Sequence, residues 1–155
     1  MKAFLEPLQE LQGFQEMADT LEKERGVITV SGCTDAQKPH MIYAMDNGLK
    51  NKIIVTFHEQ RAKELYEDYS FFDPDAVYYP AKDVLFYQSD IRGNLLTAER
   101  INALKAIHEK KQVTLITTFD ALMNTMAPPQ NMWDSVLTIH SGDILDLKKI
   151  TAQLV

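Results

Sequence analysis

Hydrophobic and polar positions recur along the chain with two periods, one typical of helices and one typical of strands. Apolar residues spaced three and four apart predict amphipathic helices, with one helix or a pair in the first range, at 3–24, 38–48, 58–70 and 97–110. Short β-branched apolar runs predict strands at 27–30, 53–57, 75–79, 113–117 and 135–139. Strands that alternate with helices imply an α/β fold, with a mainly parallel sheet covered by helices on both faces.

Finer features of the pattern predict how these elements begin, end and pack. The helix over 58–70 should turn Ala62, Leu65, Tyr66 and Tyr69 inward, and the helix over 97–110 should bury Ile101, Leu104 and Ile107. We expect Thr97 and Asp146 to cap helices, and Pro128-Pro129 to break a short helix over 119–126. Arg92-Gly93 is expected in a turn, and Arg100 is expected to pair with a carboxylate.

Composition and charge narrow the class of protein. With 155 residues, 45% of them hydrophobic, the chain is long enough for one compact domain. Its formal charge of −6, from 22 acidic and 16 basic residues, predicts poor binding to DNA by this chain alone. The single cysteine, Cys33, excludes an internal disulfide framework, and the sequence has neither a signal-peptide pattern nor an apolar run of about 18 residues. These features predict a cytoplasmic protein.

The segment GVITVSGCTDAQKP, residues 26–39, has the layout of a strand that leads into a phosphate-binding loop. An intact loop has the pattern G-x-x-x-x-G-K-[ST], in which backbone N–H groups and the Lys hold phosphates and the hydroxyl binds Mg²⁺. Gly32 and Lys38 keep the first glycine and the lysine, but Gln37 replaces the second glycine and Pro39 replaces the Ser or Thr. Gln at a position that needs left-handed backbone costs about 1–2 kcal/mol. The segment is therefore either a degenerate phosphate loop or an ordinary turn between a strand and a helix.

Other candidate chemistry lacks the residues it needs. A phosphatase loop of the C-x5-R type would require arginine where Pro39 stands, so Cys33 has no partner to lower its pKa. The four histidines are His40, His58, His108 and His140, and none has the close spacing of metal ligands. A phosphorelay receiver needs an acidic pair after its first strand, where this chain has Ser31-Gly32-Cys33.

An aromatic group occupies the middle of the chain, at Phe71, Phe72, Tyr78, Tyr79, Phe86 and Tyr87. Aromatic side chains can stack on unpaired bases, but single-strand binders place them in a basic groove. Here the carboxylates of Asp73, Asp75, Asp83 and Asp90 are interleaved with only Lys82 and Arg92. We expect packing inside the core or between domains.

The order of several motifs makes a resemblance specific. The helix over 62–68 reads A-x-x-L-Y-x-D; it is followed by P-x-x-D-x-L-x-Y from Pro80 to Tyr87, by E-R-x-x-A-L from Glu99 to Leu104, and by the ending SGDILDLKKITAQLV. In this order the segments resemble the N-terminal UvrB-homology module of bacterial transcription-repair coupling factors (Mfd). The related repair protein UvrB carries an intact loop, G-x-T-G-S-G-K-T, whereas this chain has Asp35, Gln37 and Pro39 at the glycine, glycine and threonine positions.

The resemblance implies a fold and a division of the chain. The fold would be a degenerate P-loop NTPase domain, similar to RecA and to domain 1a of UvrB. We expect an N-terminal helical segment over 1–25, the UvrB-like α/β domain over 26–142, and the truncated start of the next subdomain over 143–155. The resemblance further implies that UvrA binds through the subdomain after Val155, and that RNA polymerase and DNA are contacted only through the full-length protein, an ATP-dependent DNA translocase whose ATPase lies in a separate domain.

Two hypotheses about function remain open at this point. The first is a noncatalytic scaffold and protein-interaction module, with no catalytic residue, metal or cofactor in these 155 residues, in which Gly32, Gln37, Lys38 and Pro39 form an inactive loop. The second is a UvrB-like nucleotide-binding enzyme domain that tolerates Gln37 and Pro39 and still contacts a phosphate through Lys38.

Overall fold

The computed structural model describes residues 2–23, 26–45, 51–82, 90–109, 112–126, 128–134, 136–144 and 146–154. The chain divides into two compact units, Met1–Asn124 and Thr125–Val155. The first unit contains, in chain order, α1 (Lys2–Gln9), α2 (Phe14–Lys23), α3 (Gln37–Ala44), β1 (Asn51–Thr56), α4 (Glu59–Ser70), β2 (Val77–Tyr79), α5 (Asp90–Glu109), β3 (Val113–Thr118) and α6 (Phe119–Met123). The second contains α7 (Pro129–Asp134) and α8 (Leu147–Leu154).

A three-stranded parallel sheet in the order β1-β3-β2 forms the centre of the first unit. Ile54 of β1 lies opposite Ile116 of β3, and Ile53 lies opposite Leu115. All six residues of β3 are buried, as expected of a middle strand with both faces covered. The predicted α/β architecture with a parallel sheet is confirmed.

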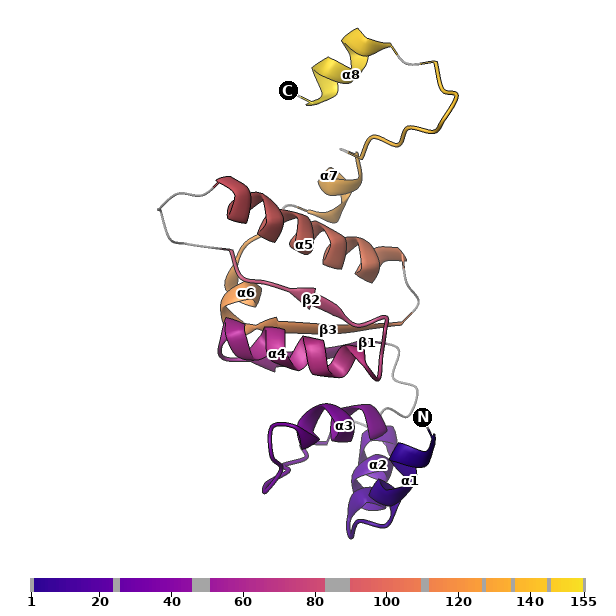
Figure 1. Cartoon of the computed structure of the whole chain (residues 1–155), viewed down its shortest axis with the longest axis vertical. Helices are drawn as coiled ribbons and strands as arrows, with labels where there is room; N and C mark the ends of the chain where they lie inside the picture. Colours follow the sequence, from indigo (N-terminus) through magenta and orange to yellow (C-terminus); the bar gives the residue numbers. More distant parts are fainter. Residues whose placement is uncertain are drawn as a thin grey trace. The chain divides into compact units, whose positions relative to one another are not determined.

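Helices cover both faces of this sheet, as Figure 1 shows for α4 on one side and α5 on the other. On the α4 face, Ala62, Leu65 and Tyr69 pack with Ile116, and Ile42, Tyr43, Ile54, Tyr66 and Tyr78 surround them. On the α5 face, Ala103 packs with Tyr79, Leu115 and Ala121 of α6. The predicted inward face of the 58–70 helix is therefore confirmed.

The inward face of α5 differs from the prediction. Ile101 and Ile107 are exposed, and the buried positions are Arg100 and Ala103, with Leu104 packed beside them. The apolar spacing did not reveal that Arg100 takes one of the inward positions, where it lies against the ring of Tyr79.

Two of the five predicted strands are wrong. Residues 27–30 have no regular structure, and the side chain of Val27 is 95% exposed. Residues 136–140 are likewise outside any strand. A β-branched run reports a preference for extended backbone but does not supply a neighbouring strand.

Several helix ends also differ from the prediction. α5 begins at Asp90, so Thr97 lies inside the helix rather than at its cap, and Arg92-Gly93 is helical rather than a turn. α6 ends at Met123, and α7 begins at Pro129. The expected end of the third helix at Asn47-Gly48 lies outside the described residues.

The N-terminal region forms a pair of helices, one of the two predicted arrangements. α1 and α2 are joined by a turn in which Gly13 has φ +83°, a conformation that favours glycine. Phe14 and Ala18 of α2 are buried. Gly26, beyond α2, permits a close approach, because a Cβ at this position would lie 2.8 Å from Cγ2 of Thr20.

The second unit contains two short helices, α7 and α8. Asp143 accepts the backbone N–H of His140 at 2.7 Å and closes a turn that contains Gly142 at φ +100°. Asp146 accepts the N–H of Lys148 at 3.0 Å, which confirms its predicted role as the cap of α8. The domain boundaries predicted at residues 25 and 142 stay predictions.

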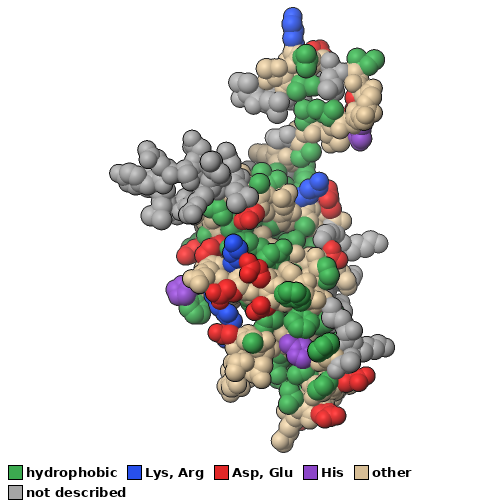
Figure 2. Space-filling model, in the orientation of Figure 1, with side chains coloured by type: hydrophobic (Ala, Val, Ile, Leu, Met, Phe, Trp, Pro, Cys, Tyr) green, Lys and Arg blue, Asp and Glu red, His purple; other side chains and the backbone are tan. Residues whose placement is uncertain are grey.

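Acidic, basic and hydrophobic side chains are interspersed on the face of the molecule drawn in Figure 2. In the described residues no helix is both long enough and apolar enough to cross a membrane.

Candidate functional site

Gly32, in the loop over 31–39, has a backbone conformation that favours glycine. Its φ is +82°, and apart from its chain neighbours no atom lies within 4 Å of the position that a Cβ would occupy. Glycine is therefore favoured here by the backbone conformation and not by the space around it.

The backbone conformation at position 37 is not the left-handed one that the phosphate-loop pattern predicts. Gln37 is the first residue of α3 and has helical backbone. Its side-chain Oε1 accepts the N–H of Thr34 at 3.0 Å, and its own N–H donates to the Thr34 carbonyl at 3.1 Å. Gln37 thus bonds back to Thr34, in the turn that precedes α3, through both its side chain and its backbone.

The backbone donors after the loop are used inside the loop. The N–H of Lys38 lies 3.3 Å from the carbonyl oxygens of both Thr34 and Asp35. Pro39 has no N–H, and its side chain is fully buried. A phosphate loop binds its ligand largely through such N–H groups. Here the N–H of Lys38 is already bonded within the loop, and position 39 has none.

The charged groups of the loop are also paired with one another. Nζ of Lys38 lies 2.7 Å from Oδ1 of Asp35, and Nη2 of Arg61, from the first turn of α4, lies 3.2 Å from the same oxygen. The hydrogen bond from Lys38, followed by the charge of Arg61, lowers the pKa of Asp35. Sequence reasoning missed the contact between Arg61 and Asp35, because nothing in the sequence places the start of α4 beside the loop.

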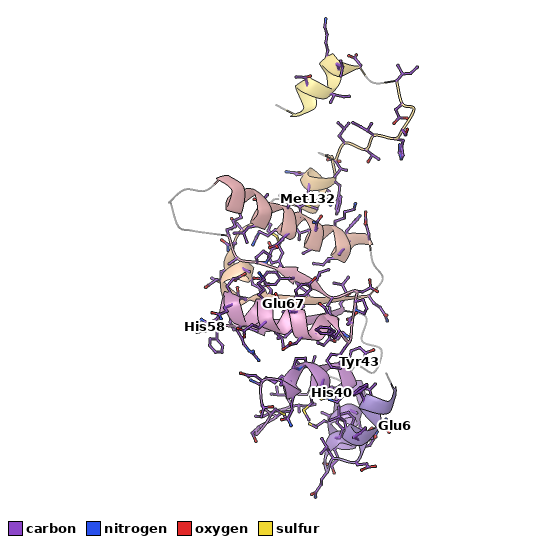
Figure 3. All side chains as sticks on the ribbon, in the orientation of Figure 1. Glu6, His40, Tyr43, His58, Glu67 and Met132 are labelled. Carbon is purple, nitrogen blue, oxygen red and sulfur yellow. The ribbon has the colours of Figure 1, made fainter. Side chains whose placement is uncertain are left out.

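Aromatic packing anchors the helix that follows the loop. Nε2 of His40 lies 2.7 Å from the carbonyl oxygen of Phe4 in α1, and its ring stacks on Phe72 with centroids 5.5 Å apart. Tyr43 also packs on Phe72, at 5.5 Å, and Figure 3 shows His40 and Tyr43 on α3. α3 is thus tied to α1 and to the segment that follows α4.

A second polar cluster lies at the carboxyl ends of the strands, where parallel sheets place their ligands. Glu59 accepts the hydroxyl of Tyr78, the N–H of Ala81 at 3.1 Å and the hydroxyl of Thr118 at 3.1 Å. Burial, and then the hydrogen bond to Glu59, raise the pKa of Tyr78. One carboxylate therefore links the start of α4 to the ends of β2 and β3.

Arg100 makes a similar brace from α5. Its Nη1 donates to the carbonyl oxygen of Pro80 at 2.5 Å, its Nη2 donates to the hydroxyl of Tyr79, and its guanidinium carbon lies 4.1 Å from the centre of the Tyr79 ring. The described partners of Arg100 are thus a carbonyl and a tyrosine, where a carboxylate was expected. Like Glu59, this side chain holds the polypeptide itself in place.

The aromatic group is mainly packed, as expected. Tyr79 is buried, Tyr78 stacks on Tyr66 with centroids 5.8 Å apart, and Phe72 packs on His40. Phe71 differs, with 80% of its side chain exposed. Asp83, Leu85, Phe86 and Tyr87 lie outside the described residues.

The remaining candidate ligands have separate neighbours. The ring of His58 lies against Phe57, and Nδ1 of His140 lies 3.6 Å from Asp143. Sγ of Cys33 lies 3.4 Å from Sδ of Met41. Within the described part of the chain, no three His, Cys, Asp or Glu side chains gather as a metal site would require.

Comparison with known proteins finds a similarity in sequence to a repair protein. The chain is 25% identical over 154 residues to the UvrABC system protein B of Hydrogenovibrio crunogenus; the match covers 97% of this chain and 22% of that protein. No family model matches the chain. The chain thus spans about a fifth of the length of the relative it matches, and the similarity, which extends over nearly the whole chain, supports a UvrB-like module.

Proposed function

We propose that this chain is a noncatalytic scaffold and interaction module of a transcription-repair coupling factor, and that the full-length protein acts in nucleotide excision repair. In this proposal the module holds an adjacent subdomain that binds UvrA. RNA polymerase and DNA are contacted by other parts of the full-length protein, which hydrolyses ATP in a separate domain. The similarity to UvrB supports the repair setting. The departures from the intact loop at Asp35, Gln37 and Pro39 favour the coupling factor over UvrB itself.

The observation that carries the proposal is the internal use of the loop's donors. The N–H groups of Gln37 and Lys38 bind the loop's own carbonyl oxygens, and the ammonium of Lys38 binds Asp35. Pro39 offers neither an N–H nor a hydroxyl for Mg²⁺. A nucleotide would have to break several of these contacts before it could gain its own.

The proposal predicts that the chain does not bind ATP in the presence of Mg²⁺. Isothermal titration calorimetry of this chain with ATP and Mg²⁺ tests it directly, with Lys38→Ala as the matched variant. We expect no binding in the micromolar range by either protein. Micromolar binding by the unaltered chain that disappears in Lys38→Ala would contradict the proposal.

A rebuilt loop tests whether the lost donors are the cause. The double substitution Gln37→Gly with Pro39→Thr restores the glycine and the hydroxyl of an intact loop. If it creates binding of ATP and Mg²⁺ that the parent lacks, the chemistry of the loop was lost while its path remained. If the parent already binds as well as the double variant, the loop is active as it stands.

A UvrB-like nucleotide-binding domain is the second candidate function. It is favoured by Gly32 with its φ of +82°, by the retained Lys38 and by the similarity to UvrB. The full-length protein separates the two candidates. Under the first, Lys38→Ala leaves ATP hydrolysis by the full-length protein unchanged; under the second, ATP hydrolysis is lost.

A further inference from the structure

Asp35 lies between two cationic side chains that come from different helices. Lys38 belongs to the first turn of α3, and Arg61 belongs to the first turn of α4. Both approach the same oxygen of Asp35, at 2.7 Å and 3.2 Å. The two helices pack against each other, so the spacing of the two cations is set by the fold.

We propose that Lys38 and Arg61 form an anion site for a phosphate group, and that Asp35 fills this site from within the chain. The inference rests on the proposed function, because it gives a second reason why the loop holds no nucleotide. Asp35 stands at a position where the UvrB pattern has glycine, so the internal anion and the loss of the loop's chemistry occur together.

The geometry of the two cations suits a phosphate oxygen. Ammonium and guanidinium groups form short charge-assisted hydrogen bonds with phosphate as they do with carboxylate. Arg61 is oriented in advance, because its Nη1 donates to Glu64 at 3.0 Å one turn further along α4. A phosphate in place of the carboxylate would meet two cations whose positions are already fixed.

The site is partly open to solvent. The side chain of Lys38 is 51% exposed, that of Asp35 is 63% exposed and that of Arg61 is 25% exposed. Nη2 of Arg61 is itself buried and has no hydrogen-bond partner among the described residues, so a dissolved anion reaches Lys38 directly and reaches Nη2 only after it displaces the neighbouring carboxylate of Asp35. While Asp35 is present, a group held three residues from Lys38 acts at an effective concentration of millimolar or more, and dilute phosphate does not compete with it.

The test is a titration of the chain with inorganic phosphate, followed by ¹H–¹⁵N NMR shifts of the backbone around residues 34–40 and 61. Asp35→Asn removes the charge and keeps the size of the side chain. We expect this variant to bind phosphate about tenfold more tightly than the unaltered chain, or better, with a dissociation constant in the range of about 1–10 mM. Asp35→Ala should give the same gain.

Two further variants make the result specific. Asp68→Asn removes one negative charge from an exposed position on the same helix, α4, and should give no gain. Arg61→Gln added to Asp35→Asn should abolish the gain, because it removes one of the two cations. The inference is overturned if Asp35→Asn and Asp35→Ala bind phosphate no better than Asp68→Asn, or if the gain survives Arg61→Gln.

Failure of this inference is distinct from failure of the proposed function. The proposed function fails when the unaltered chain binds ATP with Mg²⁺. The inference fails when the Asp35 variants gain no affinity for inorganic phosphate, whatever the unaltered chain does with ATP.

Discussion

Two side chains of this protein have structural roles that their residue types alone do not predict. Gln37 replaces a glycine of the phosphate-loop pattern and accepts a backbone N–H at the start of a helix. Arg100, the most polar of the buried side chains on α5, bonds to a carbonyl and lies on an aromatic ring. In both cases the role depends on a partner that only the folded chain brings within reach.

The pKa of Asp35 gives a prediction at this scale. A carboxyl group whose pKa is lowered in the folded state stabilises that state at pH values above its pKa in the unfolded chain, near 3.8. The protein loses this stabilisation as the pH falls from 3.8 through the lower pKa of the folded state. We expect Asp35 to titrate below 3.8 by carboxyl ¹³C NMR, and we expect Lys38→Ala to raise its pKa more than Arg61→Gln does. A pKa at or above 3.8 in the unaltered chain would show that the two cations do not hold this carboxylate.

Arg100 gives a second prediction. Arg100→Met keeps the apolar stem but leaves the carbonyl of Pro80 without its guanidinium donor, and we expect it to lower the free energy of unfolding by about 1–3 kcal/mol. Lys105→Met, on the exposed side of the same helix, removes only a surface ion pair and should change it by about 0.5 kcal/mol or less. Urea unfolding followed by circular dichroism compares the two. Equal effects would mean that the buried guanidinium contributes no more than a surface charge.

At the scale of elements, the strands show what a sequence can and cannot predict. The alternation of strands and helices correctly predicted β1, β2, β3 and the helices between them, because each of these segments buries a side that its own residues define. The runs at 27–30 and 135–139 have the same β-branched character, yet their described residues form no strand. The difference is the pairing with a neighbour, a property of the sheet that no single segment encodes.

The sequence likewise predicts some features of the candidate site and not others. The position of the loop and the losses at Gln37 and Pro39 could be predicted from their spacing to Gly32 and Lys38. The pairing of Asp35 with Arg61 could not, because the two residues lie 26 positions apart in the chain and meet only when α3 packs beside α4.

Two neighbouring isoleucine positions in the sheet provide the prediction at this scale. Ile116 in the middle strand is fully buried, whereas Ile53 in β1 is 63% exposed. Ile116→Ala should cost about 2–5 kcal/mol, because it removes buried surface and leaves a cavity. Ile53→Ala should cost about 1 kcal/mol or less, mainly through β-propensity. Thermal or urea unfolding distinguishes them, and similar losses would contradict the order β1-β3-β2.

For the whole molecule, charge is the property that bears most on partners. The net charge of −6 repels phosphate backbones at long range, and acidic and basic groups are mixed on the face shown in Figure 2. A chain with this charge gains no long-range attraction to nucleic acid.

This view predicts that the chain alone binds DNA poorly. We expect dissociation constants weaker than about 100 μM for single- and double-stranded oligonucleotides at about 50 mM salt, measured by fluorescence anisotropy. Tighter binding that weakens steeply as salt is added would show a cationic surface that the net charge conceals. It would also favour the alternative that unpaired bases stack on exposed aromatic side chains such as Phe71.

Strand β1 has a practical consequence for the behaviour of this protein at high concentration. It lies at one edge of the sheet. The side chains of Ile53 and Val55, and of Phe57 just after the strand, are hydrophobic and exposed, whereas edge strands usually carry charged residues. An exposed edge strand of this kind can pair with the same strand of another copy. We therefore expect concentrated samples to form aggregates that dynamic light scattering detects. Ile53→Lys should slow this aggregation, whereas Lys63→Arg, which changes no residue of the edge strand, should not. If Ile53→Lys aggregates as fast as the unaltered chain, the aggregation starts at another surface.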